Sequence, residues 1–177
     1  FRKAPDSRKQ LKLIIRAYNE GLAFRYYFPG NEYLHITNEY TEYTLPEDYK
    51  AFFTPRAQSP YTLLPLKDWP GECERPLVLA RKDAPYVLLT EAEVVNYVRT
   101  KFVLSPDKAN TIIGKRYGEV DDIAPYKTPW RVVMVAEKPG ELIANNDLLL
   151  NLNPPSEIEN PWWITPGKVM REITLST

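Results

Sequence analysis

Residues 13–28 read Leu-Ile-Ile-Arg-Ala-Tyr-Asn-Glu-Gly-Leu-Ala-Phe-Arg-Tyr-Tyr-Phe. In the second half, every other residue from Leu22 to Phe28 is apolar or aromatic and projects to the same side of an extended chain. That period of two is typical of a β-strand. The first half belongs to a longer run, Leu11–Tyr18, that is also rich in β-branched and apolar residues. The stretch therefore predicts two neighbouring strands.

Asn19, Glu20 and Gly21 separate these two strands. A three-residue loop that ends in glycine suits a type I turn followed by a left-handed residue, because glycine adopts that conformation without a steric penalty. The segment therefore predicts a β-hairpin, with strands over 11–18 and 22–28.

Short strands with turn residues between them are predicted along most of the remaining chain. Their spacing of roughly 8–12 residues is typical of a β-sandwich or barrel. Helix signals are few. Residues 139–145 predict one short helical turn, and a capping-box pattern of Thr90 and Glu93 favours a helix over 91–98. The predicted strands are 33–37, 41–45, 61–66, 76–80, 86–90, 97–104, 111–113, 130–136 and 148–152.

The composition indicates a globular domain without an obvious charged partner. The 177 residues are 44% hydrophobic, and 23 basic residues balance 23 acidic ones. This neutral balance gives no field that would indicate a nucleic acid or an anionic membrane as partner. No apolar stretch approaches the length of a membrane span. The chain begins at Phe1 without a signal-peptide pattern, so we expect a chain processed or cut from something larger.

Several familiar kinds of reactive site have no support in the sequence. Cys73 is the single cysteine, so no internal disulfide can form, and its acidic neighbours Glu72 and Glu74 disfavour a thiolate nucleophile. His35 is the single histidine, which leaves no pattern for a zinc site or a His-based triad. No glycine-rich phosphate loop is present.

The C-terminal part of the chain changes character. A connector rich in proline and tryptophan covers 160–168, and residues 169–175 look like the opening of another unit. We therefore place a domain boundary near 160–166.

Five segments, in order, resemble glycoside hydrolase family 97. The resemblance implies an N-terminal β-super-sandwich, a catalytic (β/α)₈ barrel and a small C-terminal β domain. This chain would supply the later part of the sandwich over 1–162 and the linker with the start of the barrel over 163–177. The segments are 14–26, 89–97, 128–133, 147–155 and 163–168.

The resemblance implies an all-β fold, a partial antiparallel β-super-sandwich of the galactose-mutarotase-like kind with few short helical turns. It implies an α-glucosidase or α-galactosidase that acts on oligosaccharides and is periplasmic or secreted. Hydrolysis of a glycosidic bond needs two carboxyl groups. The family places them on the barrel, so no catalytic residue is expected in this chain, and its expected partner is the barrel of the same polypeptide. The alternative is a non-catalytic carbohydrate-binding or interaction module.

The family also binds calcium near its catalytic centre, with one glutamate ligand from the N-terminal domain. The resemblance assigns that role to Glu91, and Ca²⁺ does prefer carboxylate oxygens. Glu93 is the alternative ligand, and a solvated glutamate is the simpler interpretation. The resemblance further implies that 91–96 is a loop entering a strand, which replaces the helix predicted over 91–98.

Two arginines and four tryptophans are interpreted from the residues alone. Arg16 and Arg25 lie on facing strands; a buried arginine there would need a carboxylate, with Glu39 or Glu42 as candidates, whereas a surface pair is the alternative. Trp130 lies in an apolar strand and is predicted to be core. Aromatic side chains can also bind sugar rings. Trp69 is a candidate for that role by residue type alone, and Trp162 with Trp163 is predicted to pack the linker against the barrel.

Overall fold

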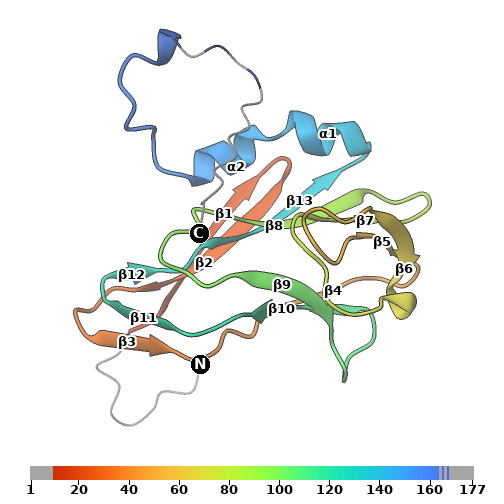
Figure 1. Ribbon diagram of the computed structural model, residues 1–177, viewed down its shortest axis with the longest axis horizontal. Helices are drawn as coiled ribbons and strands as arrows, with labels where there is room; N and C mark the ends of the chain where they lie inside the picture. The colour runs from red at the N-terminus through yellow and green to blue at the C-terminus, as the bar shows by residue number, and fades with distance from the viewer. Residues whose placement is uncertain (1–9, 164, 166, 168–177) are drawn as a thin grey trace, which may run out of the picture.

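The computed structural model describes residues 10–163, 165 and 167, and antiparallel strands dominate it (Figure 1). The largest sheet has eight strands, and some of the strands that lie side by side in its middle are far apart in sequence. Its order is β1 (Lys12–Tyr18), β2 (Gly21–Phe28), β13 (Trp130–Ala136), β8 (Tyr86–Ala92), β7 (Leu77–Ala80), β5 (Lys50–Phe53) and β6 (Thr62–Pro65), with β12 (Tyr126–Lys127) also paired to β2.

Two smaller sheets face the large one. One is β4 (Glu42–Thr44), β10 (Thr111–Arg116) and β9 (Thr100–Leu104); the other pairs β3 (Tyr33–Ile36) with β11 (Val120–Ile123). Side chains of β7 and β8 such as Leu79 and Leu89 pack against Phe102 and Ile112 in the layer between sheets. The expected partial antiparallel sandwich is confirmed.

Two short helices cover the other face of the large sheet, as Figure 1 shows. Leu142 of α1 (Pro139–Ala144) and Leu148 of α2 (Asp147–Leu152) pack on Val132 and Met134 of β13. Val133 lies between Val132 and Met134 in the strand, so its side chain points to the opposite face and packs into the core between the sheets. Strand β13 is therefore covered on both faces. Single 3₁₀ turns occur at Leu66–Asp68 and Pro161–Trp163.

The predicted hairpin is confirmed, with a tighter turn than expected. Tyr18 pairs with Gly21, so the loop holds two residues, Asn19 and Glu20, and not three. Gly21 is a strand residue with a φ of 155°, and a Cβ on it would lie 2.1 Å from the Val133 carbonyl oxygen. The glycine is therefore needed because β13 passes so closely.

Most predicted strands are present, and one is wrong. Residues 148–152 form α2, because Leu148 and Leu152 lie four positions apart and are both buried while Leu150 is exposed. A short apolar run does not by itself distinguish a strand from a buried helix. The short helix over 139–145 is confirmed as α1, and β5, β11 and β12 were not predicted.

The C-terminal part of the predicted domain division stays a prediction. The linker and barrel start expected over 163–177 lie almost entirely outside the described residues. Among the residues that the structure describes, no helix is long and apolar enough to cross a membrane.

Candidate functional site

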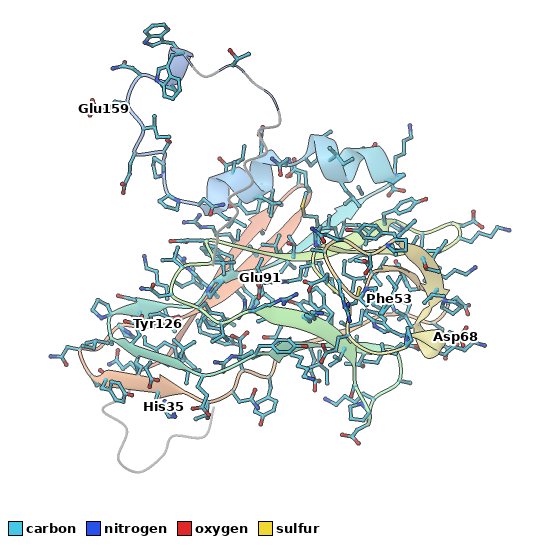
Figure 2. The ribbon with its side chains drawn as sticks, viewed as in Figure 1. His35, Phe53, Asp68, Glu91, Tyr126 and Glu159 are labelled. Atoms are coloured by element: carbon cyan, nitrogen blue, oxygen red, sulfur yellow. The ribbon has the colours of Figure 1, made fainter. Side chains whose placement is uncertain are left out.

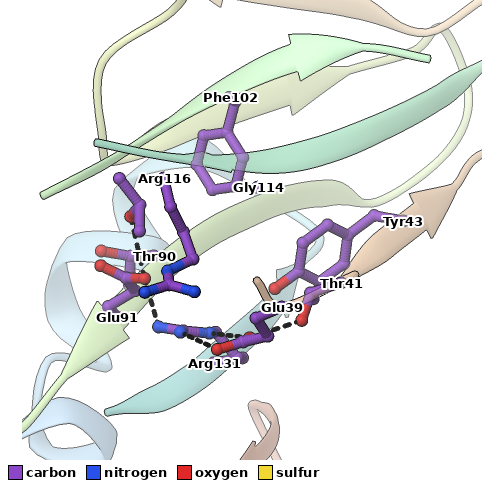
Figure 3. Close-up of a pocket in the computed structure, with 10 residues that line it drawn as sticks. Glu39, Thr41, Tyr43, Thr90, Glu91, Phe102, Gly114, Arg116 and Arg131 are labelled. Carbon is purple, nitrogen blue, oxygen red and sulfur yellow. Dashed lines mark hydrogen bonds and ion pairs between the residues drawn. The ribbon is translucent and has the colours of Figure 1, made fainter. Parts of the chain in front are cut away.

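A network of charged side chains lies between the large sheet and its covering strands (Figure 3). Arg131 of β13 and Glu91 of β8 are paired across the two strands, so both side chains project to the same face. Glu39, from the segment between β3 and β4, reaches the same place. The three side chains are 5%, 6% and 9% exposed, respectively. Figure 2 shows Glu91 in the middle of the domain.

The Arg131 guanidinium joins the two carboxylates. Its Nε donates to Glu39 Oε1 at 2.8 Å, and its Nη2 donates to Glu39 Oε2 at 2.6 Å. Its Nη1 donates to Glu91 Oε1. Parallel donation of this kind is the strongest geometry available to an arginine and a carboxylate. One buried cation therefore serves two buried anions from distant parts of the chain.

Hydroxyl groups complete the shell around Glu39. Tyr97 Oη donates to its Oε2 at 2.5 Å, and Thr41 Oγ1 donates to its Oε1 at 2.7 Å. Burial alone would raise the pKa of Glu39, but the hydrogen bonds and charge of Arg131, with the two hydroxyls, outweigh it and lower the pKa below 4.5. Glu39 is therefore ionised at neutral pH.

Glu91 has a second cationic partner. Its Oε1 accepts from Thr100 Oγ1 at 3.0 Å, and its Oε2 forms an ion pair with Arg75. Burial lowers the pKa of Arg75, and the charge of Arg131 lowers it further. The Glu91 carboxylate is thus held between two guanidinium groups.

The cavity at this network is small. Its volume is about 20 Å³, and it is lined by Glu39, Glu91 and Arg131, by Thr41 just before β4, and by six neighbours from β4, β8, β9 and β10. A cavity needs roughly 10–15 Å³ to hold one water molecule. The network can hold a water and cannot admit a sugar ring.

The sequence profile of the glycosyl hydrolase 97 N-terminal domain matches residues 2–155, which is most of the chain. The chain belongs to this family. A retaining alpha-galactosidase of Bacteroides thetaiotaomicron is 25% identical over 203 residues, covering 92% of this chain and 30% of the galactosidase.

Solved family 97 structures resemble this domain in three dimensions. A family 97 enzyme of Pseudoalteromonas sp. strain K8 in complex with acarbose has a TM-score of 0.79 and 26% identity, over 89% of this chain and 25% of that one. A variant from the same organism in complex with panose gives the same values. The chain therefore spans about a quarter to a third of the length of these relatives.

The surroundings of Glu91 do not by themselves make a calcium site in this family 97 domain. Within the described residues, no group of three or more His, Cys, Asp or Glu side chains converges on a point where a metal ion could bind. The two guanidinium groups beside Glu91 compete with a Ca²⁺ ion for the same oxygens and repel it. The calcium role of Glu91 stays a prediction about a longer protein.

The alternative ligand, Glu93, lies just beyond the end of β8. Its Oε2 accepts from Arg25 Nη1 at 2.5 Å and from Trp130 Nε1 at 3.2 Å, and its side chain is 25% exposed. Arg25 is buried, and its carboxylate partner is Glu93, so both Glu39 and Glu42 were the wrong candidates. The alternative, a surface pair across the hairpin involving Arg16 and Arg25, is also wrong, because Arg25 is buried and Arg16 Nη1 donates to the Asn151 carbonyl oxygen.

The tryptophans divide into core and surface. Trp130 is fully buried, as predicted, and the guanidinium carbons of Arg25 and Arg16 lie 4.1 Å and 4.8 Å from the centroid of its ring system. Trp69 is buried against Phe53 and offers no sugar platform. Trp162 and Trp163 are 86% and 65% exposed. Their predicted packing against a barrel involves residues beyond this chain.

Sequence reasoning missed Arg131 as the centre of the network. A signal was present, because an arginine inside the apolar run Trp130–Ala136 needs a buried carboxylate wherever that strand is covered on both faces. The sequence does not say which carboxylate, since Glu39 is 92 positions away along the chain.

The single histidine gives a pH-dependent prediction outside the network. His35 Nδ1 lies 2.7 Å from Asp121 Oδ1, and its Nε2 lies 3.2 Å from Glu119 Oε2. The hydrogen bond and charge of Asp121 raise the pKa of His35 above 6.5. This contact stabilises the fold at pH values below the pKa that His35 has in the unfolded chain. The stabilisation is lost as the pH rises through the higher pKa of His35 in the folded protein.

A proton NMR titration should therefore show one histidine with a raised pKa. In Asp121→Asn, we expect the value to return toward 6.5 because the first cause of the shift is removed. Glu119→Gln is the matched control and should move the pKa less. Equal shifts in the two variants would contradict the assignment to Asp121.

Proposed function

We propose that this chain is the sandwich part of an α-glycoside hydrolase, an α-glucosidase or α-galactosidase that acts on oligosaccharides. In this proposal the domain forms a wall of the active site, and the carboxyl groups that cleave the bond belong to the remainder of the polypeptide. The observation that carries the proposal is the family match over residues 2–155, supported by relatives described as a retaining alpha-galactosidase and as enzymes in complex with acarbose or panose.

The charges of the domain support a non-catalytic role for the chain alone. Glycoside hydrolysis needs two carboxyl groups on either side of a bound sugar. The buried carboxylates of Glu39 and Glu91 instead share one guanidinium beside a cavity of about 20 Å³. No substrate can enter between them.

Two assays test the proposal. The longer polypeptide that contains this sequence should hydrolyse p-nitrophenyl α-glucoside or α-galactoside, and the 177-residue chain alone should not. Turnover by the chain alone at the rate of the longer polypeptide would overturn the division of labour. Absence of activity toward both substrates in the longer polypeptide would overturn the hydrolase assignment.

A carbohydrate-binding role without a barrel is the second candidate, and one surface feature favours it. An open hollow of about 730 Å³ is lined by Tyr86 and by polar side chains of β5 and of the β7–β8 turn, including Lys50 and Arg81. Aromatic and polar groups together are the usual means of holding a sugar. Calorimetry of the chain with maltose-type and melibiose-type sugars tests this role, and no heat at millimolar ligand would remove it.

The calcium prediction has its own test. If Glu91 acts only through its ion pairs, Glu91→Gln lowers the free energy of unfolding by about 3 kcal/mol in this chain, equally with and without Ca²⁺. If Glu91 is also a calcium ligand in the longer polypeptide, the same substitution weakens Ca²⁺ binding in a calorimetric titration. Glu93→Gln is the matched variant there. A larger loss of Ca²⁺ affinity in Glu93→Gln would transfer the role to Glu93.

Export to the periplasm or medium completes the proposal, and its support is the family resemblance. Fractionation of cells that produce the longer polypeptide checks it. Enzyme that is retained with cytoplasmic markers would contradict an exported location.

A further inference from the structure

The open hollow beside Tyr86 is built on the face of the large sheet that carries the two helices. Lys50 of β5 is paired with Ala80 of β7. The antiparallel register of β7 with β8 then places Ala80 beside Tyr86. Tyr86 packs with the side chains beneath α1 and α2. Because paired residues of neighbouring strands project to the same face, Lys50, Ala80 and Tyr86 form one row across three strands.

The middle member of this row has the smallest side chain, and the surface is hollow above it. Ala80 lies between the ring of Tyr86 on one side and the long side chain of Lys50 on the other. Leu63 of β6, which is 46% exposed, also lines the hollow. An apolar surface with an aromatic wall suits the C–H groups of a sugar ring.

Three cations surround this apolar surface. Lys50, Arg81 and Lys82 line the hollow, and in the described part of the chain Asp48 is the only carboxylate in its lining. The chain as a whole is neutral, with 23 basic and 23 acidic residues, so the local excess of positive charge does not follow from the composition. A hollow lined mainly by one sign of charge attracts ligands of the opposite sign.

The three cations are free to meet a ligand, and one of them is already oriented. Among the residues that the structure describes, Lys50, Arg81 and Lys82 take part in no ion pair. Arg81 Nη1 donates to the Glu47 carbonyl oxygen at 3.4 Å, and its guanidinium carbon lies 5.5 Å from the centroid of the Tyr49 ring. A guanidinium has several N–H groups, so one held in this way can still bind an anion at a reduced cost in side-chain entropy.

We propose that this hollow binds an acidic saccharide, with a sugar ring against Tyr86 and its carboxylate or sulfate oxygens on Arg81 and the two lysines. Guanidinium groups bind such oxygens through paired hydrogen bonds, and lysines add positive charge. A neutral sugar would make no use of the cations. The inference goes beyond the proposed function, because neither the α-glycosidase nor the second candidate with its neutral sugars requires a charged ligand.

Comparison of an acidic saccharide with its ester tests the role of charge directly. The 177-residue chain is titrated by calorimetry with trigalacturonate and with its trimethyl ester, which has the same sugar rings without the charges. We expect the acid to bind at least about tenfold more tightly at low salt, and to lose most of that advantage at about 0.5 M NaCl, because the cations are exposed.

A sulfated galactose trisaccharide is the second arm of this titration. Tighter binding of either acidic sugar than of the ester supports the proposal and identifies the anionic group. Equal affinity for the ester and both acidic sugars would overturn the proposal and support the neutral-sugar candidate instead. Binding of none of the three would overturn it as well. A single-stranded oligonucleotide that binds more tightly than both acidic sugars would overturn the saccharide as the ligand class.

Substitutions around the hollow should change the affinity in opposite directions. Arg81→Met should weaken binding of the acidic saccharide at least about fivefold, whereas Asp48→Asn removes a repelling carboxylate and should tighten it. Asparagine tolerates the φ of 70° at this position, so the backbone is preserved. The control is Lys127→Met on β12, an exposed position at the opposite end of the large sheet (Figure 1), which should leave the affinity unchanged. Equal losses in Arg81→Met and Lys127→Met, or weaker binding in Asp48→Asn, would overturn the proposal.

Discussion

Replacing Arg131 by methionine should lower the free energy of unfolding by about 3–5 kcal/mol, the range expected when a buried ion pair loses one partner. The variant leaves Glu39 and Glu91 facing each other without the cation that joins them. A domain of this size is stable by roughly 5–15 kcal/mol in total, so the substitution removes a large part of it. Urea unfolding followed by tryptophan fluorescence measures the change.

Arg99→Met is the matched control. Arg99 is paired with Glu74, but its side chain is 58% exposed, and Glu74 keeps a second cation because Lys101 Nζ lies 3.2 Å from its Oε1. Exposed ion pairs contribute roughly 0–1 kcal/mol, so this variant should lose little. Equal losses in the two variants would mean that the location of Arg131 has no special importance.

The pH dependence of the same variant provides a sharper test. In the natural protein the lowered pKa of Glu39 gives stability that is present above 4.5, the ordinary value, and is lost as the pH falls through the folded pKa. In Arg131→Met, Glu39 stays buried but loses its cation, which should raise its pKa instead. That variant should therefore regain stability on acidification, and the gap to the natural protein should narrow. Parallel pH profiles would contradict this account of the network.

The parts of the fold that sequence predicted are those decided by local contacts. The period of two around Gly21 and the short segment after Pro139 each carry their signal within a few residues, and both the hairpin and α1 are present. The strand β12 has only two residues, Tyr126 and Lys127, which is too short for a pattern. The leucine run 148–152 was misread because its helical period is decided by burial on β13, a tertiary contact.

The charged partners could be predicted in kind but not in identity. A buried Arg25 demands a carboxylate, and the sequence offered Glu39 and Glu42, whereas the strand order brings Glu93 to it from 68 positions away. Glu39 instead pairs with Arg131, and this ion pair links β13 to the segment before β4. Such pairings are decided by how the sheets pack, and the positions of charged residues along the sequence do not reveal that packing.

Replacing Gly21 by alanine should also lower the free energy of unfolding strongly, by about 3 kcal/mol. The added Cβ would lie 2.1 Å from the Val133 carbonyl oxygen and 2.8 Å from the Met134 Cα, and both are backbone atoms that cannot rotate away. The hairpin cannot tilt to make room without breaking its own attachment, because the Val135 amide donates to the Glu20 carbonyl oxygen at 2.8 Å. The strained φ of 155° adds to the loss.

Gly140→Ala is the matched control for this last prediction, and it should act in the opposite direction. Gly140 lies in the first turn of α1, and apart from its chain neighbours and its own helix backbone no atom lies within 4 Å of the position that its Cβ would take. Alanine in a helix is favoured over glycine by roughly 0.5–1 kcal/mol, so the variant should unfold at a slightly higher urea concentration. If Gly21→Ala also stabilised the protein, the close approach of β13 to the hairpin would not exist in solution, and the register that brings Arg131 beside Glu91 would be in doubt with it.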